Sequence, residues 1–241
     1  MDFTVVKGMQ SEIFVPVTPP PVWAPVTKPL KDMVVAIATA AGVHHKDDKR
    51  FNLAGDFTFR IIKDTMPSSE LMVSHGGYDN SDVNKDINCM FPIDRLHELA
   101  KNGVIKGVAP VHIGFMGGGG NQEKFKNETG PAIAKILKDE GVDAVILTAG
   151  WGTCHRSAVL VQRAIEEAGI PTIIIAALPP VVRQTGTPRA VAPLVPMGAN
   201  AGEPNNIEMQ YNIVKDTLEQ LEEIESAGKI VPLPYEYVAK V

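Results

Sequence analysis

Short, continuously apolar runs alternate with longer helical segments along this chain, and that alternation is the strongest constraint on its fold. The apolar runs, rich in Val and Ile, span residues 33–39, 107–116, 142–149 and 171–178. The helical segments span residues 91–101, 122–140, 154–168 and 205–226. Strands that are apolar at every position need cover on both faces, and helices between them provide it. We therefore expect an α/β fold with a doubly wound, Rossmann-like and mostly parallel sheet.

Three segments fall outside this alternation. Residues 1–32 contain six prolines, which interrupt helices and central strands, and they predict an extended arm that either lies on its own domain or wraps a partner subunit. Residues 57–62 fit either a strand or a helical turn. Residues 179–204 again hold six prolines together with many apolar side chains, and they predict a long ordered loop over the site. Residues 33–241 are expected to form a single α/β catalytic domain.

Composition excludes several classes of function. A net charge of −5 argues against nucleic acid as the main partner, because neutralising phosphates requires an excess of Lys and Arg. No run of 18 apolar residues is present, and the first residues lack the pattern of a signal peptide. Two cysteines do not make a disulfide framework. The expected location is the cytoplasm, without a membrane span.

Four polar or glycine-rich segments each follow a predicted strand. They are His44 with His45, residues 75–79, residues 117–120 and residues 150–154. In doubly wound sheets, ligands bind at the carboxyl ends of the strands. We therefore expect these segments to gather around one site.

The turn at residues 150–154 carries the clearest chemical signal. Cys154 lies where a helix should begin, so unpaired backbone N–H groups and the helix dipole favour its thiolate. Trp151, between Gly150 and Gly152, has no evident role there. One interpretation is a buried tryptophan beside an inert cysteine, and a second is a nucleophilic cysteine. A third, a redox pair of position 151 with Cys154, fails as written because an indole has no thiol chemistry.

Three blocks of sequence, residues 147–158, 173–180 and 193–204, closely resemble the selenocysteine-containing subunits of clostridial D-proline reductases. The resemblance covers essentially the whole chain and extends more loosely to the B components of glycine, sarcosine and betaine reductases. It implies that position 151 is selenocysteine, encoded by UGA, and that Cys154 completes a Sec-x-x-Cys motif. Trp151 departs from that pattern, so the polypeptide as written would lack the catalytic nucleophile and be inactive.

The resemblance also implies a reaction, an oxidoreductase step of amino-acid (Stickland) fermentation catalysed by one subunit of a hetero-oligomer. A pyruvoyl group on a partner subunit activates D-proline, and the selenolate attacks the α-carbon and breaks the C–N bond. Cys154 then attacks selenium, which releases 5-aminopentanoate and leaves a selenide–sulfide for a reducing protein or dithiol. This chain itself is expected to bind no cofactor. The alternatives are a B component of glycine, sarcosine or betaine reductase, and a non-catalytic binding or scaffold subunit.

Several other side chains are candidates for substrate binding or proton transfer. They are His44, His45, His75, Asp79, His155, Arg183 and Arg189. An arginine can clamp a carboxylate with two hydrogen bonds. The tandem histidines lack a third ligand at metal-site spacing, so no metal is expected. Gly150 and Gly152 are expected to permit the sharp turn and a close approach of substrate to the backbone.

Overall fold

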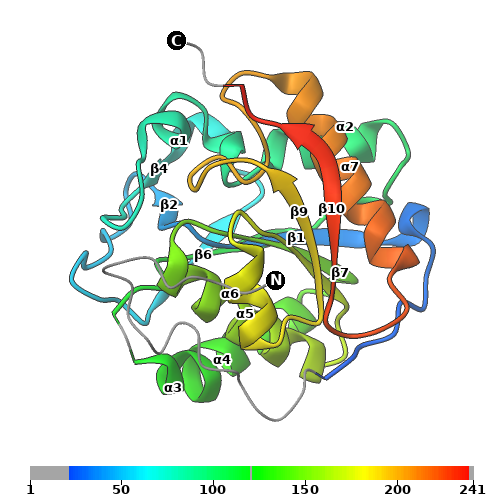
Figure 1. Ribbon diagram of the computed structural model, residues 1–241, viewed down its shortest axis with the longest axis horizontal. Coiled ribbons are helices and arrows are strands. Elements are labelled where there is room, and N and C mark those ends of the chain that lie inside the picture. The colour runs from blue at the N-terminus through cyan, green and yellow to red at the C-terminus, as the bar shows by residue number, and fades with distance from the viewer. Residues whose placement is uncertain (1–21, 120, 239–241) are drawn as a thin grey trace.

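The apolar runs form the centre of a mixed sheet in the computed structural model, which describes residues 22–119 and 121–238 (Figure 1). Its strands lie in the order β10-β9-β8-β7-β1-β6-β3, with β5 paired to β1. Their bounds are β1 Val34–Ala40, β3 Phe59–Lys63, β5 Gly107–Val108, β6 Val111–Phe115, β7 Ala144–Ala149, β8 Thr172–Ile175, β9 Arg189–Leu194 and β10 Lys229–Glu236. All of these pairings are parallel except that of β3 with β6. The predicted α/β fold with a mostly parallel sheet is confirmed.

The chain reverses its direction of travel across the sheet between β1 and β7. From β1 it passes to β6 on one side, and then returns to β7 on the other side before continuing to β8 and β9. Numbered in chain order, these five parallel strands lie as 2-1-3-4-5, the flavodoxin-like arrangement, in which the crevice beyond the strands at the reversal point binds ligands. The loops that follow Ala40 and Ala149 meet at that point.

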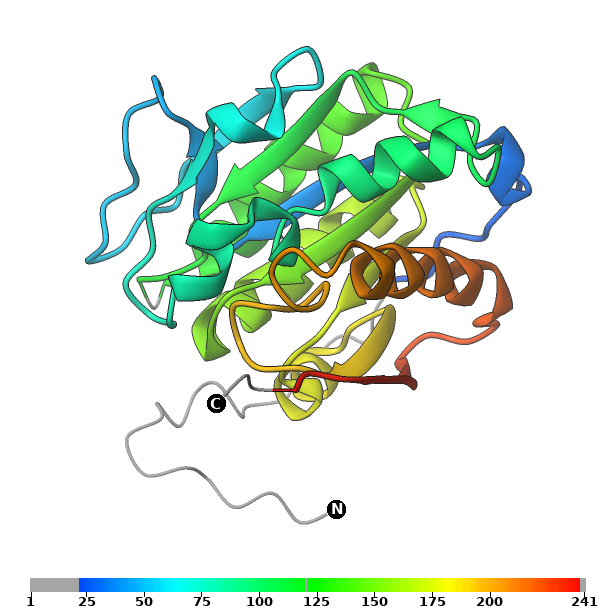
Figure 2. The same ribbon diagram turned by 90° about the horizontal axis from the view of Figure 1, so that it is seen from above.

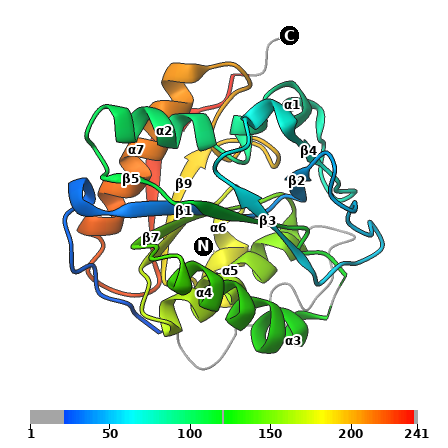
Figure 3. The same ribbon diagram turned by 180° about the vertical axis from the view of Figure 1, so that it is seen from behind.

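Helices cover both faces of the sheet because its strands are apolar on both sides. α2 (Ile93–Lys101) and α7 (Ile207–Glu223) pack side by side on one face, as Figure 2 shows from above. α4 (Gly130–Asp139), α5 (Gly152–Glu167) and α6 (Pro179–Thr185) lie on the other face (Figure 3). Side chains along β1 alternate between the two cores, since Val35 and Ile37 contribute to the first and Ala36 and Ala38 to the second.

A separate two-stranded sheet lies beside β3 and β6 of the main sheet. It consists of β2 (Val43–His45) and β4 (Leu71–Val73), which run antiparallel, and β4 is followed by α1 (Ser81–Lys85) after a glycine-containing loop. The predicted helix over residues 122–140 is built from α3 (Gln122–Lys124), a π-helical turn (Phe125–Thr129) and α4. Within residues 22–119 and 121–238, no helix has the length and apolar character needed to cross a bilayer.

One sequence-based expectation needs correction, and one segment that the sequence left open is resolved. Residues 179–204 are not a long loop, because they contain α6 and β9. Prolines 179 and 180 open α6, where the backbone N–H that proline lacks has no helical partner to lose. Residues 57–62, left open by the pattern, belong mostly to strand β3. Of the predicted arm, residues 1–21 lie outside the described residues, while Ala24 is buried and residues Leu30–Asp32 form a 3-10 turn.

Candidate active site

The Gly150–Trp151 turn joins β7 to α5 at the reversal point of the sheet. Trp151 has an extended backbone and precedes Gly152, the first residue of α5. Its carbonyl accepts a hydrogen bond from His155 N–H at 2.8 Å, which closes the first turn of the helix. Gly150 has no room for a side chain, since a Cβ built there would lie 2.2 Å from Cε1 of Tyr78. The turn therefore depends on a glycine at this position.

Cys154 lies in the first turn of α5 and is fully buried. Its Sγ is 3.2 Å from the Met116 carbonyl oxygen and 2.9 Å from Nε2 of His75. Met116 follows β6, and His75 follows β4, so three segments distant in sequence meet at this sulfur. The structure thus brings His75 and Cys154 together, as expected for two segments that both follow strands at this edge, although the sequence did not predict their direct contact.

The predicted thiolate of Cys154 is not supported. Burial raises the pKa of this thiol to about 12, although backbone N–H groups at the helix start act in the opposite direction. A buried anion loses its hydration, and in this case that cost exceeds what the start of the helix supplies. Cys154 is therefore a neutral thiol at neutral pH in this arrangement.

His75 is also neutral near pH 7. Burial lowers its pKa to about 4, and its side chain is held between Cys154 and Tyr78, whose ring centroid lies 4.8 Å from that of the imidazole. The Tyr78 hydroxyl donates to the carbonyl of Ala41, directly after β1. Tyr78 thereby links the His75 loop to the end of the central strand.

Trp151 lines a cleft that His75 of this cluster also lines. The cleft has a volume of about 370 Å³, and its walls include His75, Met116 and Thr153. Much of the remaining wall is backbone, from Gly76, Gly77, Gly118 and Gly119. The indole packs so closely on the His75 loop that a Cβ at position 77 would lie 2.7 Å from its Cε3. Trp151 is nevertheless 38% exposed, so a group at position 151 can be reached from solvent.

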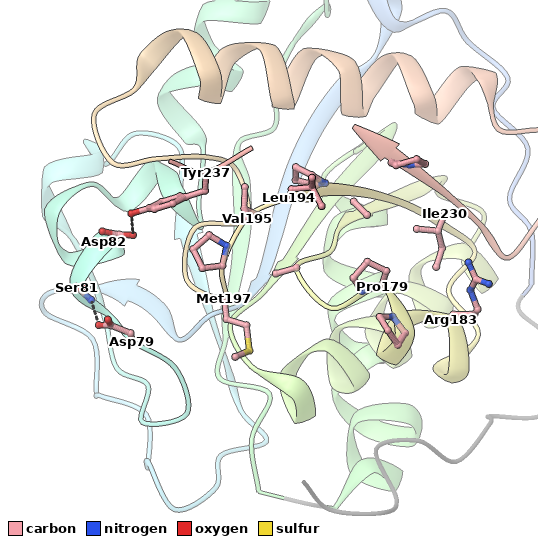
Figure 4. Close-up of a pocket in the computed structure, with 16 residues that line it drawn as sticks. Asp79, Ser81, Asp82, Pro179, Arg183, Leu194, Val195, Met197, Ile230 and Tyr237 are labelled. Atoms are coloured by element: carbon pink, nitrogen blue, oxygen red, sulfur yellow. Dashed lines mark hydrogen bonds between the residues drawn. The ribbon is translucent and has the colours of Figure 1, made fainter. Parts of the chain in front are cut away.

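A larger, mostly apolar groove of about 1020 Å³ adjoins this region (Figure 4). Asp79, Asp82 and Tyr237 lie at one end of it, and Pro179 and Arg183 lie at the other. The Ser81 backbone N–H donates to Asp79 and lowers the pKa of that carboxyl group. Two candidates from the sequence, Asp79 and Arg183, therefore line this groove rather than the cleft at Trp151.

The other candidate histidines are placed differently. His155 is fully buried one residue after Cys154, its Nδ1 lies 2.7 Å from the Trp151 carbonyl oxygen, and burial lowers its pKa to about 4. Its position suits holding the turn. His44 and His45 lie in β2 rather than in a loop, and His44 is buried with Nε2 2.8 Å from the Ser74 hydroxyl. Neither lines the cleft at Trp151.

Arg189 does not lie at the carboxyl edge of the sheet, where the carboxylate clamp was expected. It begins β9, its side chain is fully buried, and Nη1 donates to Glu166 at 2.7 Å. Nη2 donates to the Ala24 carbonyl, and the Trp23 ring lies 3.4 Å from the guanidinium carbon. All of these contacts are within the protein, so Arg189 stabilises the packing of the segment that contains Trp23 and Ala24.

Among the described residues, no three His, Cys, Asp or Glu side chains gather to hold a metal ion. The contributions of Tyr78 and Met116 to the site were not expected from the sequence. Met116 acts through a backbone carbonyl, which carries no sequence signal. Tyr78 could have been noted from its place directly after Gly76 and Gly77.

Comparison with known proteins places these residues in a family. Residues 6–150 match the family described as glycine/sarcosine/betaine reductase selenoprotein B, and the match ends one residue before Trp151. The chain is 77% identical over 240 residues to D-proline reductase subunit gamma of Acetoanaerobium sticklandii. That alignment covers 100% of this chain and 99% of the relative.

More distant relatives are longer proteins. The chain is 33% identical over 188 residues to sarcosine reductase complex component B subunit beta of Peptoclostridium acidaminophilum. It is 32% identical over 189 residues to glycine reductase complex component B subunit gamma of Carboxydothermus hydrogenoformans. Each alignment covers 75% of this chain and 42% of the relative, so the chain spans less than half the length of these two proteins. No solved structure matches the chain.

Proposed function

Because the chain belongs to the glycine/sarcosine/betaine reductase selenoprotein B family, we propose that it is a subunit of a D-proline reductase whose nucleophile belongs at position 151. The assignment of D-proline as the substrate rests on the full-length identity of 77% to a D-proline reductase subunit. The identity to the glycine, sarcosine and betaine relatives is 33% or less. A role as a B component of those reductases is correspondingly less well supported.

Selenocysteine at position 151 would suit the geometry of the turn. The position precedes the first turn of α5, whose backbone N–H groups and dipole favour an anion. It is partly exposed beside a cleft, in contrast to the buried Cys154, so a selenolate there would keep its ionised form and meet substrate. The glycine-rich walls of the cleft allow a small amino acid to approach the backbone closely.

The proposed reaction uses position 151 and Cys154 in succession. The selenolate attacks the α-carbon of D-proline, so that a C–Se bond forms, the C–N bond breaks and the ring nitrogen takes the electron pair. A pyruvoyl group on a partner subunit activates the substrate for this step. Sγ of Cys154 then attacks selenium, an S–Se bond forms, and the α-carbon takes the electron pair of the C–Se bond and a proton. The product is 5-aminopentanoate, and a dithiol or reducing protein returns the S–Se pair to its reduced form.

A tryptophan at position 151 cannot carry out the first step. The indole supplies no nucleophile, and its ring packs on Gly77 in the wall of the cleft. The chain with Trp151 is therefore expected to be inactive. It would keep the fold, because the neighbouring turn is held by Gly150, Tyr78 and the first turn of α5.

The test is an assay of the chain with a pyruvoyl-bearing partner subunit, D-proline and a dithiol, with 5-aminopentanoate measured as the product. Trp151→Sec is expected to give turnover, Trp151→Cys a much lower rate, and the Trp151 chain none. Leu53→Cys is the matched control, since it adds a thiol to the wall of the same cleft but away from the start of the helix. It should give no product.

Substrate preference separates the proposal from its alternatives. The Trp151→Sec enzyme should act on D-proline and leave glycine, sarcosine and betaine unchanged. Faster turnover of one of those three substrates would reassign the chain to a B component. Product formation by the Trp151 chain itself would refute the assignment of position 151.

A further inference from the structure

The sulfur of Cys154 has two polar partners, and both come from other segments of the chain. They are the Met116 carbonyl oxygen at 3.2 Å and Nε2 of His75 at 2.9 Å. We propose that His75 is the positioning residue of Cys154, and that its Nε2–H donates a hydrogen bond that holds Sγ and stabilises the thiolate that forms when the thiol releases its proton before the attack. The inference rests on the proposed role of Cys154 as the thiol that attacks selenium.

The hydrogen bonds around the imidazole determine which nitrogen carries the proton. The backbone N–H of Gly77 donates to Nδ1 of His75 at 2.9 Å. A backbone N–H is only a donor, so Nδ1 must be the acceptor and the neutral ring must carry its hydrogen on Nε2. Nε2 faces Sγ and, at 3.1 Å, the Met116 carbonyl oxygen. His75 is therefore arranged as a donor to the sulfur and not as the base that removes its proton.

This donor matters because the thiol is difficult to ionise. Cys154 is fully buried, and burial raises its pKa to about 12. The Met116 carbonyl can accept from the thiol but has nothing to donate to a thiolate. His75 is the side chain that can donate to the anion, in addition to the backbone N–H groups at the start of α5, and a hydrogen bond to an ionised partner is stronger than one between neutral groups.

The loop that carries His75 is itself held in place. Asn80 donates to the His75 carbonyl at 2.7 Å, and Tyr78 packs on the imidazole while its hydroxyl donates to Ala41. Of the neighbouring titratable groups among the described residues, Tyr78 of this loop contacts the imidazole, and His155 follows Cys154 in α5 with its Nδ1 on the Trp151 carbonyl oxygen. Burial raises the pKa of Tyr78 and lowers that of His155 to about 4, so both stay neutral near pH 7 to 9. They add no charge to the pair over that range.

The test measures Cys154 in the chain with Trp151, without substrate, so its outcome does not depend on D-proline reduction. Cys89→Ala leaves Cys154 as the single thiol. Because Cys154 is buried, a small reagent is needed, and the rate of its modification by methyl methanethiosulfonate, which requires the thiolate, is compared between variants at each pH from 7 to 9. His75→Leu, which removes the donor, is expected to lower the rate about tenfold or more at each pH. His75→Gln, which retains a donor, should recover most of that loss.

Two controls separate this role from a purely structural one. His97→Leu makes the same replacement at a half-exposed histidine on α2 and should leave the rate unchanged. In 15N NMR of the Cys89→Ala chain, His75 should show a protonated Nε2 and an unprotonated Nδ1, and Cys154→Ala should shift the Nε2 resonance. Equal rates for His75→Leu and the parent, or a proton on Nδ1, would overturn the proposal, even if the chain proves to be a D-proline reductase subunit. If the modification rates and the NMR spectra agree with the proposal but the D-proline reduction assay gives no product, only the proposed function is refuted.

Discussion

At the scale of single residues, the site depends on side chains that pack closely against the backbone of glycines. Tyr78 occupies the space that a side chain on Gly150 would need, and the indole of Trp151 occupies the space above Gly77. These glycines are required by their neighbours and not by an unusual backbone conformation, since neither is among the residues with positive φ. The turn before α5 is therefore sensitive to the addition of one methyl group.

Gly150→Ala is expected to destabilise the protein by about 1–3 kcal/mol, because the new methyl group displaces the Tyr78 ring. Denaturant unfolding measures the change in the free energy of unfolding. Gly107→Ala on β5 is the matched control, since a Cβ there meets no atom within 4 Å, and it should alter stability by less than about 1 kcal/mol. Equal effects of the two substitutions would show that Tyr78 does not constrain the turn.

The residue types and their order predicted which segments form the site, but not the ionisation states of its side chains. The strand-to-helix turn at position 151 was expected from the apolar run that ends at Ala149 and from the glycines that follow. The neutral thiol of Cys154 was not, because its burial depends on His75 and Met116, which lie 79 and 38 residues away in sequence. Arg189 was misplaced for the same reason, since its partner Glu166 lies on another element.

At the scale of elements, β9 and the end of α5 are joined through a buried ion pair. Glu166 accepts from Arg189 and also from the backbone N–H groups of Ala24 and Thr172. Burial raises the pKa of Glu166 above its usual value, while the charge of Arg189 opposes that change. The pair therefore attaches the segment around Trp23 to the sheet.

Arg189→Ala is expected to cost about 3–5 kcal/mol of stability, because it leaves the Glu166 carboxylate buried without its counter-charge. Thermal or denaturant unfolding checks this. Arg183→Ala, an exposed arginine on α6, should change stability by no more than about 0.5 kcal/mol. If the two variants were equally stable, the ion pair would not hold these elements together.

The sequence predicted strands and helices best where a continuous apolar run is followed by a clear helical pattern. β1, β6, β7 and β8 and the helices α5 and α7 were expected close to where they lie. α6, β9 and β10 were not, since prolines mask them. Prolines 232 and 234 occur in β10, an edge strand, where the missing N–H on the open side costs no ladder hydrogen bond.

At the scale of the whole molecule, buried histidines make stability depend on pH. Burial lowers the pKa of His75 and of His155 to about 4, and it lowers those of His44 and His112 as well. In the unfolded chain a histidine titrates near 6.5, so between those values the unfolded state binds more protons than the folded one. The stabilisation is complete above about pH 7 and is lost as the pH falls toward 4.

The free energy of unfolding should therefore decrease steadily from pH 7 to pH 4.5. His75 and His155 each contribute up to about 3 kcal/mol across the full interval, at roughly 1.36 kcal/mol per pKa unit. Urea unfolding at several pH values measures the slope, and His155→Gln should make it shallower. A stability that stays constant over this range would contradict the burial of neutral histidines at the site.

The role of position 151 is tested most directly by identifying residue 151 in the protein made by its native organism. We expect a UGA codon at this position and one selenium atom per chain by intact mass spectrometry. A UGG codon, with a mass that matches tryptophan, would contradict it and make the chain a non-catalytic member of its family.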